Sequence, residues 1–559
     1  MPRTSTVVVV ILATALLTFG ASAQAPAPPA ARPKLVVVIV VDQMRADYIE
    51  RFHDRWNGGL RRLVDRGAWF TNAAYPYAET ETCPGHATIS TGVFPARSGI
   101  VGNTWYERQT PKVVTCTQDS SAHDIGLDRT SNSGDSAVQL LVPSFSEQLQ
   151  RANGKTVALA GKARAAIMLA GHRADAVLWN DENTGELSTS SAYSATMPDF
   201  ARDFARANPL SGEFAKVWTL SAPAATYKGG RSVEGENPPW GWTATFPHPL
   251  SAGEKTPGDA ESRSKFVQRW RASPFSDAWF ERLTEAAIDN MKLGKSSGTD
   301  FLGIGLSATD YIGHAFGPDS LEIEDQMLRL DQTIGALLRK LDSTVGSGNY
   351  VIALSADHGV APIPEQAKLR GIDAGRVNSS SVANRINAAI AERLGPGKYV
   401  AQTIGSDLYL ASTVSDRLNS DNALWQAIQQ AALAEPGVQR IVRRTTQNSS
   451  ETKDALLRAL SFDFFPERSG DIWIDLKLNW ILSARTANGW AGGTTHGSHN
   501  DYDQRVPLLL FGARIKPGRY TMRTSPADIA PTLAALTNIQ IAKNSGRILQ
   551  EAFASRATK

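Results

Sequence analysis

The chain has 559 residues, more than one hydrophobic core usually serves, so the sequence predicts one large domain with insertions or about two to three domains. Its 58 Lys and Arg residues nearly balance 55 Asp and Glu residues, and the formal net charge is +3 without a block of like charge. This balance argues against a nucleic-acid-binding arm or a polybasic membrane patch and favours small-molecule partners.

The N-terminus has the pattern of a cleavable export signal followed by a linker. Arg3 precedes an apolar run over residues 7–19, and small residues at 21–23 complete the pattern. We therefore expect a signal peptide over residues 1–23, cleaved near Ala23, and a Pro/Ala linker over residues 24–33. The mature protein is expected in the periplasm or the medium. The apolar run is too short to span a bilayer, and no later stretch is long enough.

Continuous apolar runs predict the strands of a parallel sheet. "KLVVVIVVD" ends at Asp42, and similar runs start near Thr156 or end at Asp310, Gly359 and Gly512. Helical patterns lie between them. The clearest covers residues 321–341, with one apolar face made of Ile323, Met327, Leu330, Ile334, Leu337, Leu338 and Leu341. The alternation predicts an α/β fold with a mostly parallel central sheet and helices on both faces, which binds ligands at the carboxyl ends of its strands.

Two regions interrupt this alternation. Residues near 180–275 are rich in Trp, Pro and Gly, and residues near 360–493 mix helices with strands such as "GDIWIDLKLNWIL". We expect both to be insertions that cap the active face of one catalytic domain over residues 34–559. A last helix is indicated by Ser525 as its cap, followed by Pro526 and Asp528.

Three carboxylates, those of Asp42, Asp310 and Asp357, fall where predicted strands end. A lone acidic residue at a strand end is more often a helix cap or a turn residue. Three such ends, each with a nearby partner, favour a functional edge of the sheet instead.

Histidines accompany these carboxylates, at His314, His358, His496 and His499. Because His314 follows Asp310 by four residues, one helical turn would place both on the same face, near enough to hold one metal ion. Each histidine alone is more often a structural residue than a ligand. Three carboxylates and three imidazoles, counting one of the last two histidines, form a mixed oxygen and nitrogen set that suits zinc better than manganese or iron.

The stretch "TETCPGHATISTG" places Thr82 and Cys83 directly before Pro84, at the predicted first turn of a helix. A threonine hydroxyl is a poor nucleophile at neutral pH, but coordination to a divalent metal would hold it as an alkoxide. Cys83 could attack instead, yet an even pair of cysteines in an exported protein favours a disulfide with Cys116. The sequence leaves that pairing open. A plain N-cap is the structural alternative for Thr82, and we predict Thr82 as the nucleophile.

Together these motifs resemble the alkaline phosphatase superfamily, in particular the secreted, monomeric bacterial alkaline phosphatases that use threonine. The resemblance covers most of residues 34–538. It rests on six segments in the family's order: "VVDQMRADY", "TETCPGHATISTGVFPARSGIVGN", "GKARAAIMLAGHRADAVLW", "DYIGHAFGP", "ADHGVAP" and "THGSHNDYDQRVPLLLFG".

The resemblance implies a role for each matching residue. One zinc ion would be held by Asp310, His314 and His496, and a second by Asp42, Thr82, Asp357 and His358. The transferred phosphoryl group would be contacted by Asn103, Lys162 and Arg164. In the loop, His496 is preferred to His499 because it begins the "HGS" motif.

Related branches differ at identifiable residues. Sulfatases need C-x-P-x-R, whereas Cys83 is followed directly by Pro84. Nucleotide pyrophosphatase/phosphodiesterases share the metals, the threonine and the asparagine, but are not expected to carry the Lys162 and Arg164 pair. Two Zn²⁺ ions nearly cancel three carboxylates and an alkoxide, so the dianion of a monoester needs the two cations that this pair supplies.

The sequence therefore predicts an exported alkaline phosphatase with two Zn²⁺ per chain, a monomer that hydrolyses small phosphate monoesters through a phosphothreonine intermediate. One alternative is a phosphodiesterase or nucleotide pyrophosphatase of the same superfamily. Another is a non-catalytic phosphate-binding protein that kept the fold.

Overall fold

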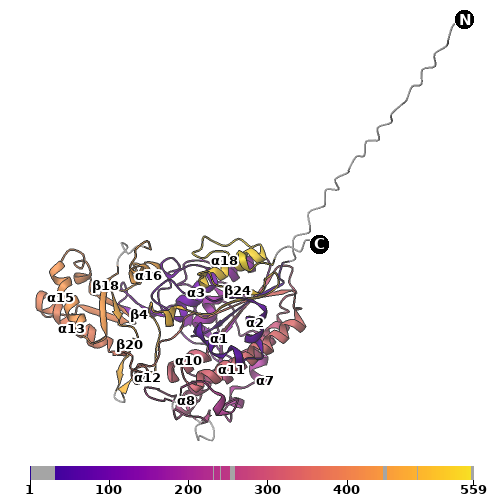
Figure 1. The fold of residues 1–559 in the computed structure, drawn as a ribbon, viewed down its shortest axis with the longest axis horizontal. Coiled ribbons are helices and arrows are strands. Elements are labelled where there is room, and N and C mark those ends of the chain that lie inside the picture. The colour runs from indigo at the N-terminus through magenta and orange to yellow at the C-terminus, as the bar shows by residue number, and fades with distance from the viewer. Residues whose placement is uncertain are drawn as a thin grey trace. The chain divides into compact units, whose positions relative to one another are not determined.

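A ten-stranded sheet runs through the centre of the fold, in a computed structural model of the chain (Figure 1). The strand order is β24-β2-β23-β14-β1-β13-β8-β9-β10-β6. The strands are β1 (Leu35–Val41), β2 (Ala68–Phe70), β6 (Asp124–Ile125), β8 (Thr156–Ala160), β9 (Ala176–Asn180), β10 (Leu187–Ser190), β13 (Asp300–Leu306), β14 (Tyr350–Ser355), β23 (Leu508–Gly512) and β24 (Gly518–Tyr520). Neighbours from β14 to β9 pair in parallel, whereas β23 and β10 run antiparallel to their neighbours. The predicted α/β class with a mostly parallel sheet is confirmed.

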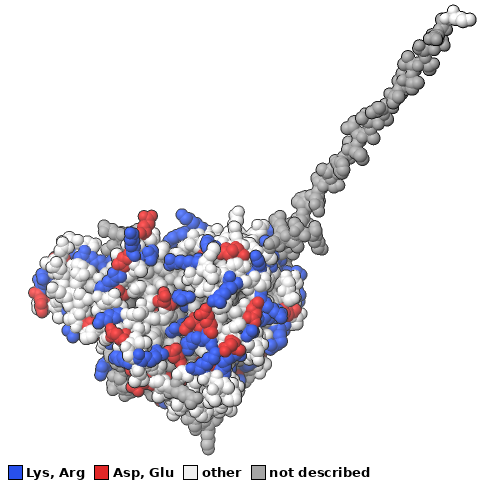
Figure 2. Space-filling view, in the orientation of Figure 1, with Lys and Arg blue, Asp and Glu red and all other residues white. Residues whose placement is uncertain are grey.

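The structure describes residues 1, 32–230, 232–239, 241–251, 259–444, 450–486 and 489–554. Everything below belongs to the compact unit of residues 32–557. The predicted signal peptide and most of the linker lie outside the described residues. No helix among the described residues is long and apolar enough to cross a membrane. On the face that Figure 2 shows, basic and acidic side chains are interspersed, in line with the balanced composition.

Helices cover both faces of the sheet because β1 is apolar at every position and buried throughout. Its alternate residues enter two different cores: Leu35 and Val37 pack with α9 (Pro274–Asn290) and α11 (Leu321–Thr344), whereas Val36 and Val38 pack on the opposite face. The helices of that opposite face are α3 (Thr82–Thr91), α6 (Ala163–Ala170) and α18 (Ile529–Thr537). The apolar face predicted for residues 321–341 is buried, as expected. Ser525 caps the short turn that leads into α18.

The two irregular regions differ in how they relate to the central sheet. Residues 180–275 contribute β10 to that sheet and also contain α7 (Asp199–Ala207), β11 (Val217–Trp218), β12 (His248–Pro249) and α8 (Ala260–Arg271). Within residues 360–493, an antiparallel sheet of β16 (Val400–Ile404), β17 (Asp407–Leu410), β18 (Val438–Arg443) and β19 (Ile472–Leu476) packs with α13 (Ser379–Leu394), α15 (Asn422–Leu433) and α16 (Ala455–Asp463). The sheet, α13 and α15 share a hydrophobic core of their own. The insertion boundaries themselves remain a prediction.

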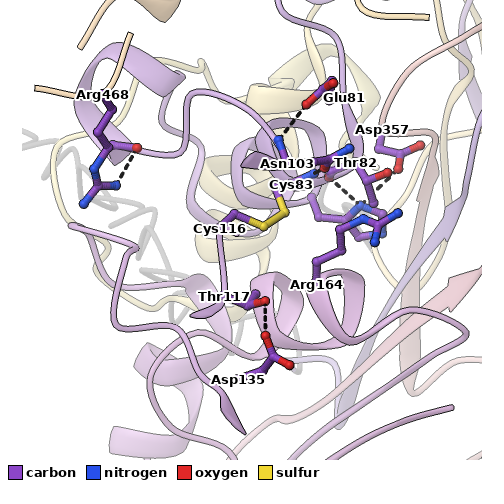
Figure 3. Close-up of a disulfide and its surroundings, with 12 residues drawn as sticks. Glu81, Thr82, Cys83, Asn103, Cys116, Thr117, Asp135, Arg164, Asp357 and Arg468 are labelled. Carbon is purple, nitrogen blue, oxygen red and sulfur yellow. Dashed lines mark hydrogen bonds and ion pairs between the residues drawn. A yellow bond between two sulfur atoms is a disulfide. The ribbon is translucent and has the colours of Figure 1, made fainter. Parts of the chain in front are cut away.

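A disulfide joins Cys83 in the first turn of α3 to Cys116, which follows β4 (Lys112–Thr115) (Figure 3). Their Cα atoms are 6.6 Å apart. Asn103 reinforces the link, because its side-chain oxygen accepts from the Cys83 N–H at 2.9 Å and its backbone oxygen accepts from the Cys116 N–H at 2.9 Å. The pairing that the sequence left open therefore fixes the start of α3.

We expect that replacing both cysteines by alanine lowers the free energy of unfolding by about 2 to 5 kcal/mol, because the unfolded chain is no longer closed into a loop. The two residues are 33 positions apart. Denaturant unfolding with and without a reductant measures this loss. The reductant should weaken the natural protein by a similar amount and leave the variant unchanged. Equal stability of the two proteins under oxidising conditions would contradict the expectation.

Candidate active site

Three adjacent parallel strands bring the predicted carboxylates to one edge of the sheet. Asp42 follows β1 and Asp357 lies two residues after β14, while Asp310 lies in α10 (Ala308–Phe316), directly after β13. All three residues are at least 97 % buried, since the exposed fraction is 1 % for Asp42, 0 % for Asp357 and 3 % for Asp310. Neighbouring parallel strands end at the same edge, so this clustering follows from the strand order.

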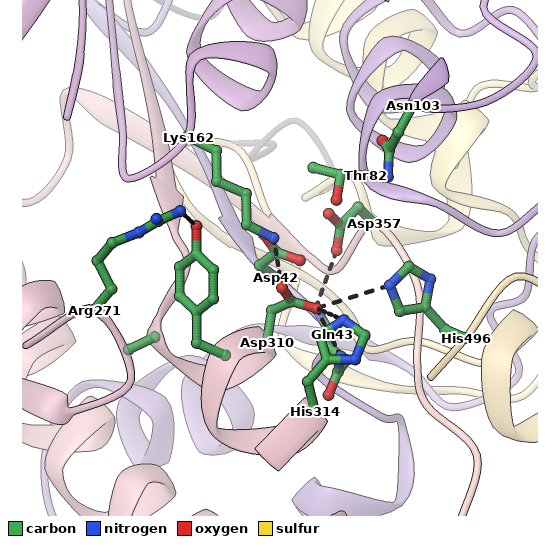
Figure 4. Close-up of polar contacts among 12 residues, drawn as sticks. Asp42, Gln43, Thr82, Asn103, Lys162, Arg271, Asp310, His314, Asp357 and His496 are labelled. Atoms are coloured by element: carbon green, nitrogen blue, oxygen red, sulfur yellow. Dashed lines mark hydrogen bonds and ion pairs between the residues drawn. The ribbon is translucent and has the colours of Figure 1, made fainter. Parts of the chain in front are cut away.

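The site residues form two groups of three potential metal ligands. In each group the ligand atoms lie within 4.8 Å of one another. The first group is Asp310, His314 and His496, and the second is Asp42, Asp357 and His358. In the first group, Oδ1 of Asp310 lies 3.1 Å from His314 Nε2 and 3.8 Å from His496 Nε2 (Figure 4). The rings of His358 and His496 stack with centroids 3.5 Å apart, so the two groups adjoin.

All three imidazoles are oriented by backbone carbonyls. Nδ1 of His314 lies 2.8 Å from Thr494 O, Nδ1 of His496 lies 2.8 Å from Thr80 O, and Nδ1 of His358 lies 2.9 Å from Gly359 O. A hydrogen bond from each Nδ1–H leaves the lone pair on Nε2, the atom that faces the carboxylates in every case. Burial also lowers the pKa of His358 and of His496, which favours the neutral, ligating form.

The second group contains polar atoms without a hydrogen-bond partner. Oδ1 of Asp42 and Nε2 of His358 are buried, unpaired and 3.6 Å apart. Burial raises the pKa of Asp42 well above its usual range, and the charges of Asp310 and Asp357 raise it further. Burying such atoms without partners is costly, and a divalent cation between them would satisfy both. The residues present therefore fit a metal ion.

Lys162 connects the two groups. It precedes α6, and its Nζ lies 2.7 Å from Asp42 Oδ2 and 2.6 Å from Asp310 Oδ2 (Figure 4). Burial alone would lower the pKa of Lys162, but the charges of Asp310 and Asp42 outweigh it and raise the pKa. A charged ammonium therefore faces one carboxylate of each group.

Thr82 is the first helical residue of α3, while Glu81 occupies the N-cap position. Its side chain is 1 % exposed, and Figure 4 shows its hydroxyl facing Asp357. Gly85 permits this approach, because a Cβ at that position would overlap the backbone of Asp357. The structure thus places Thr82 beside the second group and not at the cap that the structural alternative assumed.

Of the remaining predicted residues, Asn103 and Arg164 belong to segments that contact α3, whereas His499 does not lie with them. Asn103 is tied to this turn by the Cys83 N–H described above, and its own N–H donates to Glu81 Oε2 at 2.6 Å. Arg164 lies in the first turn of α6, which packs on α3, and its guanidinium contacts Glu182 Oε1 at 3.3 Å. His499 lies apart from both groups, with Nδ1 3.5 Å from Asp475 Oδ1.

Gln43 is a site residue that the sequence reasoning missed. Its side-chain amide donates to Asp310 Oδ1 at 2.6 Å, and its backbone N–H donates to Asp357 Oδ1 at 3.1 Å, so it holds one carboxylate of each group. It adopts a left-handed backbone with φ of 66°. Gly313 makes room for it, since a Cβ there would overlap the amide oxygen of Gln43. Its position directly after Asp42 was the only available signal.

His86 is a second residue without an assigned role in the sequence analysis. Its ring is buried, and Nδ1 lies 2.9 Å from Thr82 O and 3.2 Å from Asp357 Oδ2. It therefore links the first turn of α3 to the second metal group.

We expect Gly313→Ala to weaken the binding of Zn²⁺, used as a probe, by about 10 to 100-fold, because the added methyl displaces Gln43 from Asp310. In a Gln43→Ala background the methyl meets no amide, so the second substitution should cause no further loss. A competition titration against a chelator measures both. Gly212→Ala is the matched control, since a Cβ there meets nothing within 4 Å. Additive losses in the double variant would contradict this coupling.

Comparisons with known proteins agree with this geometry. Residues 36–501 match the model of the family described as type I phosphodiesterase / nucleotide pyrophosphatase. A protein of Myroides odoratus named calcium-transporting ATPase is 33 % identical, covering 93 % of this chain and 95 % of its own. Alkaline phosphatase PhoV of Synechococcus elongatus is 32 % identical, covering 93 % of each. A crystal structure of alkaline phosphatase PafA superposes with a TM-score of 0.83 and 30 % identity, covering 94 % of this chain and 100 % of that one.

Proposed function

The chain belongs to the type I phosphodiesterase / nucleotide pyrophosphatase family, and we propose that it acts within that family as an alkaline phosphatase. The observation that carries this proposal is the pair of adjoining ligand groups with Thr82 beside one of them and the ammonium of Lys162 between them. We propose hydrolysis of phosphate monoesters by an exported protein that acts as a monomer on small substrates.

Two zinc ions per chain suit the donor set. One would be held by Asp310, His314 and His496, and the other by Asp42, Thr82, Asp357 and His358. When bound, such ions supply Lewis-acid charge that lowers the pKa of a nearby hydroxyl and stabilises charge on a departing oxygen.

The chain's own residues divide the remaining work. Thr82 Oγ1 loses its proton and attacks phosphorus in line as the ester P–O bond breaks; the departing oxygen takes up a proton, which gives phosphothreonine and the released alcohol. Water then attacks the same phosphorus from the opposite side, the bond between phosphorus and Thr82 Oγ1 breaks, and inorganic phosphate leaves while a proton from the water restores the Thr82 hydroxyl. Asn103, Lys162 and Arg164 would contact the transferred oxygens, and the positive end of α3 lies beside them.

Charge favours a monoester over a diester. A monoester dianion carries one more negative charge than a diester, and Lys162 and Arg164 supply cations for it. A diester also carries a second organic arm that would meet these side chains. A phosphodiesterase remains the second candidate, because the matching family is described by that activity.

We expect active protein to contain about two zinc ions per chain and to lose its phosphatase activity on chelation, because a threonine hydroxyl is a poor nucleophile without a bound cation. Elemental analysis and initial rates before and after chelation measure this. Full activity in metal-free protein would contradict it.

Arg164→Ala should lower monoester kcat/KM by about 10 to 100-fold, because a charged hydrogen bond to phosphate is worth roughly 1.5 to 3 kcal/mol. Diester kcat/KM should fall less. Lys162→Ala is a less selective test, because Lys162 also contacts two proposed metal ligands. Initial rates on a monoester and a diester with the same leaving group measure the difference.

Arg173→Ala is the control, because this exposed arginine lies beyond the other end of α6. Equal losses for both esters in Arg164→Ala would favour the phosphodiesterase instead.

A further inference from the structure

We propose that a cavity beside His314 receives the substrate's leaving group and that it favours a leaving group with an aromatic ring. The inference rests on the phosphatase function proposed above and names the class of monoester that the site would prefer. The cavity has a volume of about 640 Å³. It is lined mainly by Pro238, Pro239, Trp242, Arg271, Tyr311 and His314.

The location follows from the direction of the reaction. In-line displacement places the attacking and departing oxygens on opposite sides of phosphorus. Thr82 lies with the second group of ligands, so the departing oxygen lies toward the first group, which contains Asp310 and His314. Tyr311 and His314 belong to the same helix as Asp310, so the cavity opens beside the position of that oxygen.

A second cavity, of about 180 Å³, also borders the first group, at His496. Its walls include the acidic side chains of Glu79, Glu81 and Asp475, and none of its described lining residues is a lysine or an arginine. This cavity therefore offers no side-chain cation that would attract a phosphate dianion. The smaller cavity is therefore the less suitable of the two for a phosphate ester.

The wall of the larger cavity carries positive charge. Arg271 is 9 % exposed, and its buried Nε has no hydrogen-bond partner. Its guanidinium lies 4.2 Å from the ring centroid of Tyr311, and the Lys162 ammonium lies 4.9 Å from the same centroid. Glu182 lies 3.2 Å from Arg271 and 3.3 Å from Arg164. This row of charges runs from the proposed phosphate contacts to the cavity. Asp42 and Asp310 neutralise Lys162, and Glu182 neutralises one of the two arginines, so one arginine charge remains uncompensated.

The other walls are apolar and held in place. The indole N–H of Trp242 donates to Pro249 O at 2.7 Å, and its ring stacks on His248 with centroids 4.7 Å apart. Pro238 and Pro239 present further rings on the same loop between β11 and β12. Small-molecule pockets usually combine such fixed apolar walls with a few polar groups, and aromatic rings pack well against them. A short aliphatic alcohol would leave most of this volume unfilled.

The test compares 1-naphthyl phosphate with ethyl phosphate in zinc-loaded enzyme. Because the intrinsic reactivity of each ester is the same in every variant, a change in the ratio of their kcat/KM values reports contacts with the leaving group. Trp242→Ala removes an apolar wall. Gln268→Trp narrows the cavity instead. Because Gln268 is exposed on α8, this variant should fold, and it still tests the inference if Trp242→Ala does not fold.

We expect the naphthyl-to-ethyl ratio to fall about tenfold in each variant. Trp425→Ala, which removes a half-buried tryptophan from α15, should leave the ratio unchanged. A ratio within about twofold of the natural protein in the folded cavity variants would overturn this inference while leaving the phosphatase function standing. Absence of zinc-dependent hydrolysis of both esters by the natural protein would instead overturn the proposed function, and the inference with it.

Discussion

Mutual repulsion among three buried carboxylates is the constraint on which the rest of the site depends. Asp42, Asp310 and Asp357 end neighbouring parallel elements, so the sheet itself forces them together. Like charges this deep are stable only beside cations, because water is not available to screen them. Lys162 meets part of this need, and the imidazoles oriented beside the carboxylates prepare the site for metal ions to meet the remainder.

The same constraint explains why distant segments converge on the loop before α3. The backbone oxygen of Thr80 accepts a hydrogen bond from His496, and the Thr80 hydroxyl exchanges hydrogen bonds with the backbone of Ser498, so the proposed nucleophile and a proposed metal ligand share one support. Asp463, from α16, accepts from the N–H groups of Ala78 and Glu79 at 2.8 and 2.9 Å. Through Asp463, the region over residues 360–493 therefore helps to position Thr82, because it holds the backbone of the loop that leads to Thr82.

Local patterns in the sequence were sufficient to predict the strand ends and the acidic residues that follow them, because apolar runs and a four-residue helical spacing are local properties. The fold class follows from the same runs. Gln43 could not be recognised in this way, because its role depends on residues far away in the sequence. Its hydrogen-bond partners Asp310 and Asp357 are 267 and 314 positions away, and Gly313, which makes room for it, lies close to Asp310 in the chain. The support that Asp463 gives to Ala78 spans 385 positions and escapes local reasoning for the same reason.

Chemistry and specificity therefore come from different parts of the chain. The groups proposed to act on phosphorus lie at strand ends and at the first turns of helices, where packing on both faces of the sheet fixes them. The walls of the cavity beside His314 come largely from residues 237–239, 241 and 242 and from the end of α8, which contribute no proposed metal ligand. Tyr311 joins the two parts, because it shares a helix with Asp310 while its ring faces both Lys162 and Arg271. Substitutions in the loop can thus alter which alcohol is released without disturbing the charge balance that the carboxylates require.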